Sequence, residues 1–267
     1  MWRDSHVFAG WRIQENILTG HFRLLDTEDI RRAWGSYAQC KERLDGLKRS
    51  EDIHPPSKHL VLLAHGILRS TGTFSALEKV LIEAGFDAVA ISYPSSQGTI
   101  EEHADGLARL LDRQEGSEVV SFVTHSMGGI VIRHLLARDG EWKRRIKVRR
   151  IVMIAPPNQG SAIARMLKDL PAYRLIYGKA GQQLTPEEVA KAPALHHPFA
   201  IIAGGKGDDG GFNPLLPGDD DGTVRLAETR LEGAADFLVV PEIHMSISNH
   251  PETIRATVNF LKHGNFN

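Results

Sequence analysis

One serine in this chain stands where a strand pattern changes into a helix pattern. A mostly apolar run over 119–123 comes before Ser126, and residues 130–136 repeat apolar side chains at helical spacing. A serine at such a corner has a strained backbone that pushes its hydroxyl above the sheet, so small residues are needed two positions away. Gly128 meets this requirement, whereas Thr124 is branched and meets it only in part. We expect Ser126 to be a nucleophile; the alternative is an ordinary helix N-cap.

A nucleophilic serine needs a histidine to take its proton and a carboxylate to orient that histidine. The loop over 204–224 follows a predicted strand and contains five aspartates. Asp221 is the predicted acid, because Gly222 permits a sharp turn after it; Asp219 and Asp220 remain alternatives. The aspartates could also solvate the loop or bind a hard cation, although their spacing matches no EF-hand.

The histidine is predicted from the segment after the last strand pattern. His244 lies just past that strand, where a loop can lean back over Ser126. His250 comes directly before Pro251, a residue type that favours the first position of a helix, so His250 is better explained as part of a helix start. The sequence therefore favours His244 as the general base and leaves His250 as the alternative.

Two backbone N–H groups are candidates for an oxyanion hole, which stabilises the negative charge formed during acyl transfer. The N–H of Met127 lies at the start of the helix after Ser126, where the helix dipole also favours an anion. The second donor is the N–H of Ile67, because Gly66 lets the backbone after the first central strand come close. A glycine-assisted turn with no catalytic role would give the same pattern.

Apolar runs alternate with helical patterns from about residue 58 to the end, which predicts an α/β fold with a mostly parallel sheet and helices on both faces. The predicted strands are Leu60–Ala64, Ala88–Ser92, Val119–Thr124, Ile151–Ala155, Ala200–Ala203 and Phe237–Val240. Helices are predicted near 73–84, 100–113, 128–138 and 161–169, with a last one after Pro251.

The first fifty residues have a different pattern and are predicted to form a separate N-terminal unit, 1–50, packed on a main domain, 51–267. Residues 11–25 suggest a strand pair around Thr19 and Gly20, and residues 27–48 have the spaced apolar residues of an amphipathic helix capped near Asp26 or Thr27.

An insertion over 161–198 is the only segment of the main domain long enough to cover the predicted site. Its apolar residues fit a small mobile lid that lines an acyl pocket, and equally a helix packed on the sheet. The insertion is too short for a large independent cap domain.

Composition excludes several functional classes. Lys and Arg total 32 and Asp and Glu 33, giving a net charge of −1, so no overall field would recruit nucleic acid or an anionic membrane. No apolar stretch approaches the ~18 residues of a transmembrane helix, and no signal-peptide pattern is present, which favours a cytoplasmic protein. The oligomeric state stays open.

The combined motifs resemble the α/β-hydrolase superfamily, in particular its lipase- and esterase-like members. The resemblance covers about residues 58–263 and is carried by His65-Gly66, the segment around Ser126, Asp221-Gly222-Thr223-Val224 and His244, in that chain order. It implies a serine hydrolase that cleaves carboxylic esters with an apolar acyl group, acts on a small ester or lipid and requires no cofactor or metal. Other acyl-transfer chemistry, such as thioester or amide hydrolysis, and a non-catalytic binding module of the same fold are the alternatives.

Overall fold

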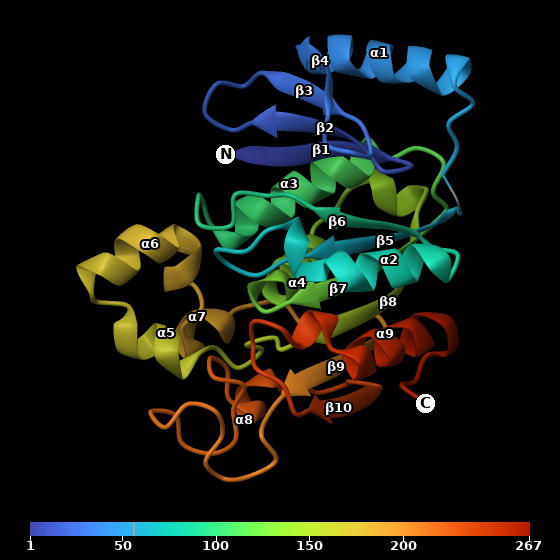
Figure 1. The fold of residues 1–267 in the computed structure, drawn as a ribbon. Helices are drawn as coiled ribbons and strands as arrows, with labels where there is room; N and C mark the ends of the chain where they lie inside the picture. Colours follow the sequence, from blue (N-terminus) through green and yellow to red (C-terminus); the bar gives the residue numbers. More distant parts are fainter. Residues whose placement is uncertain (56) are drawn as a thin grey trace.

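The computed structural model describes residues 1–55 and 57–267, which form two sheets and their covering helices (Figure 1). The larger sheet has six strands in the order β10-β9-β8-β7-β5-β6, and every neighbouring pair is parallel. Its strands are β5 (His59–Ala64), β6 (Asp87–Ile91), β7 (Val119–His125), β8 (Lys147–Ile154), β9 (Phe199–Gly204) and β10 (Asp236–Val240). All six predicted strands are present, and the expected α/β class is confirmed.

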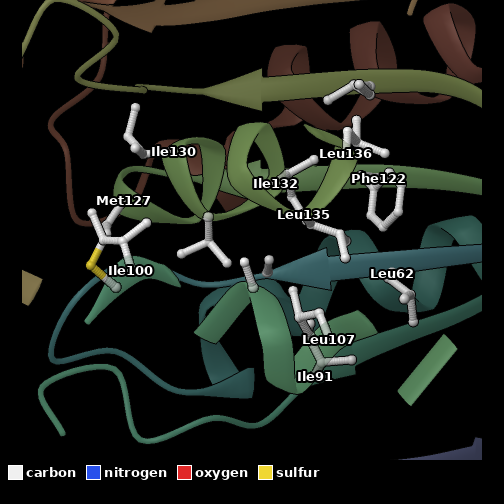
Figure 2. Packing of buried hydrophobic residues seen from close by; sticks show 14 of the residues in the cluster. Leu62, Ile91, Ile100, Leu107, Phe122, Met127, Ile130, Ile132, Leu135 and Leu136 are labelled. Carbon is white, nitrogen blue, oxygen red and sulfur yellow. The ribbon is translucent and has the colours of Figure 1, made fainter. Parts of the chain in front are cut away.

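Strands β5, β6, β7 and β9 are buried on both faces, which explains why they are mostly apolar runs rather than alternating ones. Leu60 and Leu62 of β5 belong to the cluster under α3 (Ile100–Asp112) and α4 (Met127–Ala137). Val61 and Leu63 point to the opposite face, under α2 (Ser75–Glu83) and α9 (Pro251–His263). Figure 2 shows side chains of α3 and α4 packed toward those of β5 and β7, so the strand ends that carry the site rest on a packed core.

The strand order reverses beside β5, and this reversal creates a crevice. The chain leaves β5 for β6 on one side and returns to β7 on the other side of β5. The loops after β5 and β7 therefore diverge at the carboxyl ends of adjacent strands, which is where ligands bind in open parallel sheets. The loops with Ile67 and Ser126 come from these two strands.

The N-terminal unit contains more strands than the sequence predicts. It is a four-stranded antiparallel sheet of β1 (Trp2–Phe8), β2 (Trp11–Asn16), β3 (Phe22–Leu25) and β4 (Arg31–Gly35), followed by α1 (Tyr37–Ser50). The expected strand pair over 11–25 is β2 and β3.

The predicted start of the first helix, near residue 27, was wrong, because a strand precedes the helix. The helix begins at Tyr37, where Ser36 and Gln39 form a capping box, and residues 31–35, predicted as helix, are β4. Trp34 and its neighbours in β4 pair with β3 instead, and this tertiary pairing overrides a helix-compatible local pattern.

The N-terminal sheet is attached to the main sheet at the outer strand β6. The Asp4 N–H donates to the Ser92 carbonyl at 2.9 Å, and the Ser92 N–H donates to the Asp4 carboxylate at 2.6 Å. Gln14 and Arg12 also donate to this buried carboxylate. A polar network therefore fixes the unit beside the carboxyl end of β6, close to the crevice.

The insertion over 161–198 forms three short helices beyond the carboxyl ends of the strands (Figure 1). They are α5 (Ala162–Leu167), α6 (Pro171–Gln182), which kinks at Gly178, and α7 (Pro186–Val189). The remaining short elements are η1 (Thr71–Phe74), η2 (Glu141–Arg144), α8 (Leu226–Thr229) and η3 (Ile247–Asn249). Among the described residues, no helix is long and apolar enough to cross a bilayer.

Candidate active site

Ser126 adopts the strained conformation that its position predicts. Its φ is 55° and its ψ is −127°, between the end of β7 and the start of α4. A non-glycine residue with positive φ is uncommon, and such strain persists only where the surroundings impose it. The Ser126 N–H donates to the Ile154 carbonyl of β8 at 2.9 Å, which fixes this corner against the neighbouring strand.

The glycines after Ser126 explain how the tight corner accommodates Thr124. A Cβ on Gly128 would lie 2.2 Å from the Ala64 carbonyl oxygen, so no side chain fits there. A Cβ on Gly129 would lie 3.4 Å from the Thr124 hydroxyl oxygen. Because Gly129 has no side chain, the branched side chain of Thr124 has room beside it.

We predict that Gly128→Ala destabilises the protein. The clash is with backbone, which cannot move aside as a side chain can, so the cost is at least the ~1–3 kcal/mol of ordinary overpacking. Gly46→Ala in α1 is the matched control, because a Cβ there meets nothing within 4 Å and alanine raises helix propensity by up to about 1 kcal/mol. Urea unfolding checks both changes; equal stability of the two variants would contradict the close packing inferred at Gly128.

Asp221 and His244 lie in direct contact although they are far apart in the sequence. The His244 Nδ1 is 2.6 Å from an Asp221 carboxylate oxygen, and both side chains are buried. The other Asp221 oxygen accepts the N–H groups of Thr223 and Val224, and the His244 N–H donates to the Asp221 carbonyl at 2.7 Å. These bonds fix the orientation of the Asp221 carboxylate, and the carboxylate in turn orients the His244 imidazole.

The alternative acids and the alternative base have other partners. Asp219 accepts the backbone N–H groups of Lys206 and Gly207, and Asp220 accepts those of Asn213 and Gly222, which holds the acidic loop together. The His250 side chain accepts the Glu252 N–H at the start of α9. The geometry therefore favours Asp221 and His244 over these alternatives.

The backbone N–H groups of Ile67 and Met127 are the candidate oxyanion donors near Ser126. A Cβ on Gly66 would lie 2.8 Å from the Ser126 Cβ, so this loop passes directly over the serine. In residues 1–55 and 57–267, neither the Ile67 nor the Met127 N–H has a hydrogen-bond acceptor. Leu68 is different, since its N–H donates to the Ser95 hydroxyl at 3.0 Å.

Burial keeps three imidazoles near the site neutral, those of His65, His103 and His125. Burial lowers the pKa of His65 and of His103 to about 4, and their rings flank Tyr93. Burial also lowers the pKa of His125 well below its usual range, with the nearby His244 adding to the effect. The His125 Nε2 lies 2.9 Å from the His244 carbonyl, so a neutral ring supports the backbone of the predicted base.

Acidification should therefore destabilise the fold. Burial lowers the pKa of four histidines to about 4 in the folded state: His6, His59, His65 and His103. In the unfolded chain the same histidines bind protons near pH 6.5. Stability is thus lost as the pH falls from about 6.5 toward 4. Three carboxyls oppose this trend, because burial raises the pKa of Asp87 to about 6 and also raises the pKa values of Asp4 and Glu78.

Since the four histidines outnumber these three carboxyls, we expect the Tm at pH 5 to lie at least about 5 °C below that at pH 7.5, given that 1 kcal/mol shifts the Tm of such a domain by ~2–4 °C. His103→Gln should narrow this difference, whereas replacing the exposed His54 by Gln should not. A Tm that is equal or higher at pH 5 would contradict the assignment of buried neutral histidines.

A cavity of about 140 Å³ opens beside Ser126 and is lined by residues of all the predicted loops. Ser126 and His244 both line it, and the insertion contributes apolar and aromatic side chains. The insertion residues are Ser161, Ile163, Ala164, Tyr173, Tyr177 and Leu184. Tyr173, Ala164 and Leu184 also belong to the main core cluster, so this segment both packs on the core and covers the site.

Sequence reasoning missed two residues at this site. Arg69 lines the cavity and donates to the Met245 carbonyl at 2.9 Å, directly after His244. His125 supports the His244 backbone through its ring nitrogen. Both stand within two residues of predicted site residues, and this adjacency is the only signal that the sequence offers for them.

Similar solved structures are hydrolases of the same fold. They include a mature lipase from Bacillus licheniformis, 20% identical with a TM-score of 0.61, covering 79% of this chain and 94% of that one. A metagenomic carboxyl esterase is 14% identical with a TM-score of 0.58, covering 71% and 65%. A monoacylglycerol lipase from Paleococcus ferrophilus is 18% identical with a TM-score of 0.52, covering 76% and 93%. No curated protein matches the sequence.

The fold is thus the α/β-hydrolase fold that the sequence motifs indicated. The chain belongs to the family described as "Domain of unknown function (DUF7379)", whose model matches residues 29–173. That range includes Ile67, Ser126 and Met127 but ends before Asp221 and His244.

Proposed function

We propose that this protein is a serine hydrolase that cleaves carboxylic esters. The observation that carries the proposal is the convergence of Ser126, at a strained strand-to-helix corner, and the buried His244–Asp221 pair on one cavity. A serine, a histidine and an oriented carboxylate at the carboxyl ends of parallel strands can perform acyl transfer without a cofactor or metal.

In the proposed reaction the Ser126 hydroxyl attacks the ester carbonyl while His244 takes its proton. Asp221 holds the Nδ1 proton of His244 and stabilises the imidazolium that forms. The N–H groups of Ile67 and Met127 donate to the oxyanion, and His244 then protonates the departing alcohol. Water attacks the resulting acyl-enzyme with His244 again as base, which releases the acid and restores Ser126.

A fluorophosphonate tests this proposal, because it reacts with activated serines. Intact mass and peptide mapping should find one adduct, on Ser126, and Ser126→Ala should take up none. Ser161→Ala is the matched control, since it removes another hydroxyl that lines the cavity and should still be labelled at Ser126. An adduct on Ser161 would make that residue the nucleophile, and no adduct in folded protein would favour a non-catalytic binding module; either result rejects Ser126.

The size of the cavity predicts a preference for short acyl groups. Its volume is about 140 Å³, close to the ~150 Å³ of an engineered apolar cavity that holds benzene. Among p-nitrophenyl esters, we expect the highest kcat/KM for acyl chains up to roughly six carbons, the number in benzene. The checking measurement is a series from acetate to palmitate; a maximum at palmitate would show that the insertion moves away from the site.

Other acyl-transfer reactions use the same residues, and a substrate panel separates them. Thioesters, amides and an added acceptor alcohol would be compared with the ester of the same acid. Faster turnover of a thioester or amide than of its matched ester would replace the ester assignment while retaining the triad.

A further inference from the structure

A second hollow lies beside the proposed active site and shares one residue with it. This groove, of about 530 Å³, is bounded by the N-terminal sheet and by the loops after β5 and β6. Arg69 lines both the groove and the cavity of Ser126. The groove lies within the ~300–1,000 Å³ range of small-molecule sites.

The groove is polar and positively charged. Arg23 and Arg69 line it, together with Trp2 and the amide side chains of Gln14 and Gln97. Within the described part of the chain, no Asp or Glu is among the residues that line it. The lining also contains Ser70, Ser95 and Ser96, together with Ser92 and Tyr93, whose hydroxyls donate to the Trp2 and His65 carbonyls.

Neither arginine is neutralised by a carboxylate in direct contact among the described residues. Arg69 donates to the carbonyl and sulfur of Met245, while its buried Nε has no hydrogen-bond acceptor there. Arg23 stacks over the Trp2 ring at 4.0 Å and donates to Gln14 at 2.7 and 3.0 Å. Asp4 lies beyond Gln14 and is already bonded to Arg12 and to Gln14.

The backbone is strained where it presents Arg69. Leu68 has a φ of 55°, a conformation that branched and bulky residues rarely adopt, and its N–H is fixed to the Ser95 hydroxyl. Such strain clusters at ligand-binding sites. The strained residue Leu68 stands between Ile67, the proposed oxyanion donor, and Arg69.

The position of Arg69 relative to His244 indicates which part of a substrate would reach the groove. In ester hydrolysis the histidine gives its proton to the leaving alcohol, so that alcohol must lie beside His244. Arg69 is bonded to the carbonyl of Met245, the residue after His244. The alcohol side of an ester therefore lies toward Arg69, while the acyl side lies among the apolar residues of the insertion.

We propose that the groove binds an anionic phosphate group on the alcohol of the substrate, so that the protein hydrolyses acyl esters of phosphorylated alcohols. A guanidinium that has no carboxylate partner attracts phosphate oxygens and can donate charge-assisted hydrogen bonds to them. Water cleaves the carboxylic ester into an acid and a phosphorylated alcohol, and the phosphate ester bond stays intact. This inference rests on the proposed function and specifies its substrate.

Two esters that differ only in the phosphate provide the test. The butyryl ester of glycerol 3-phosphate is compared with the butyryl ester of glycerol, and the ratio of their kcat/KM values should favour the phosphate at least tenfold. Arg69→Gln should lower this ratio by roughly 10- to 100-fold, the equivalent of one charged hydrogen bond. Arg23→Gln, which makes no contact with the His244 loop, should lower it by roughly 3- to 10-fold, as for a weaker bond. Arg43→Gln, on the exposed side of α1, should leave it unchanged.

Ligand binding to a variant that cannot turn over substrate separates the esterase proposal from the groove proposal. Calorimetry on Ser126→Ala should show binding of glycerol 3-phosphate, none of glycerol, and loss of binding when Arg69→Gln is added. If both esters are hydrolysed equally and glycerol 3-phosphate does not bind, the groove proposal is overturned and the esterase proposal stands. If neither ester is hydrolysed but glycerol 3-phosphate binds, the esterase proposal fails and the anion site stands.

The source of the phosphate is decided by a third substrate. Hydrolysis of dioleoyl phosphatidate vesicles, lowered by Arg69→Gln, would assign the anion to a lipid headgroup. Hydrolysis of only the soluble butyryl ester would assign it to a free phosphorylated alcohol. Either result supports the groove, whereas faster hydrolysis of the neutral ester overturns it.

Discussion

Ser126→Ala is expected to lower kcat for a short-chain ester by 10⁴-fold or more, a typical loss for a nucleophile that acts as part of a triad, about 10⁴ to 10⁶. The change removes the atom that forms the acyl-enzyme, and the remaining N–H donors still bind the carbonyl oxygen. KM should therefore change much less than kcat. Initial rates over a range of substrate concentrations separate the two.

The variant should fold, since alanine keeps the Cβ and the bond from the Ser126 N–H to Ile154. Ser121→Ala is the matched control, because Ser121 is a buried serine on β7, the strand that leads to Ser126, and is bonded through its hydroxyl to His59. It should leave kcat within a few-fold of wild type. A Ser126→Ala enzyme with more than a tenth of the wild-type rate would remove Ser126 from the mechanism.

Asp221→Asn is expected to lower kcat by about 10⁴-fold. Asparagine has nearly the same shape, but its amide can present an N–H to His244 Nδ1 and so stabilise the wrong tautomer. The imidazolium formed during attack also loses its counter-charge. Because Asp221 also accepts the Thr223 and Val224 N–H groups, thermal unfolding must be measured beside the kinetics.

Asp219→Asn and Asp220→Asn are the matched controls for this prediction. Each removes the same charge from the same loop, and each carboxylate holds loop backbone rather than His244. We expect losses below roughly tenfold, the effect of a weakened loop hydrogen bond of about 1 kcal/mol. A larger loss for Asp219 or Asp220 than for Asp221 would transfer the role of the triad acid.

Most of the main sheet could be predicted because β5, β6, β7 and β9 are buried on both faces. Continuous apolar runs such as 60–64 have no competing amphipathic pattern, so their local sequence and their tertiary environment agree. The segment over 31–35 is the opposite case. Its side chains are mostly exposed, and only pairing with β3 makes it a strand, so a helical interpretation was wrong there.

For the candidate site, the sequence by itself determined the strand-to-helix corner at Ser126 and the loop that contains Ile67, because strain and close approach need particular small residues at fixed spacing. It also limited the acid to a few aspartates and the base to two histidines. Only the tertiary structure decided that Asp221 faces His244, since rotations within an irregular loop choose among adjacent carboxylates. The tertiary structure alone brings Arg69 and Arg23 to one groove. Arg23 belongs to the N-terminal sheet and Arg69 follows a strand of the main sheet, and no local sequence pattern predicts that the two sheets meet.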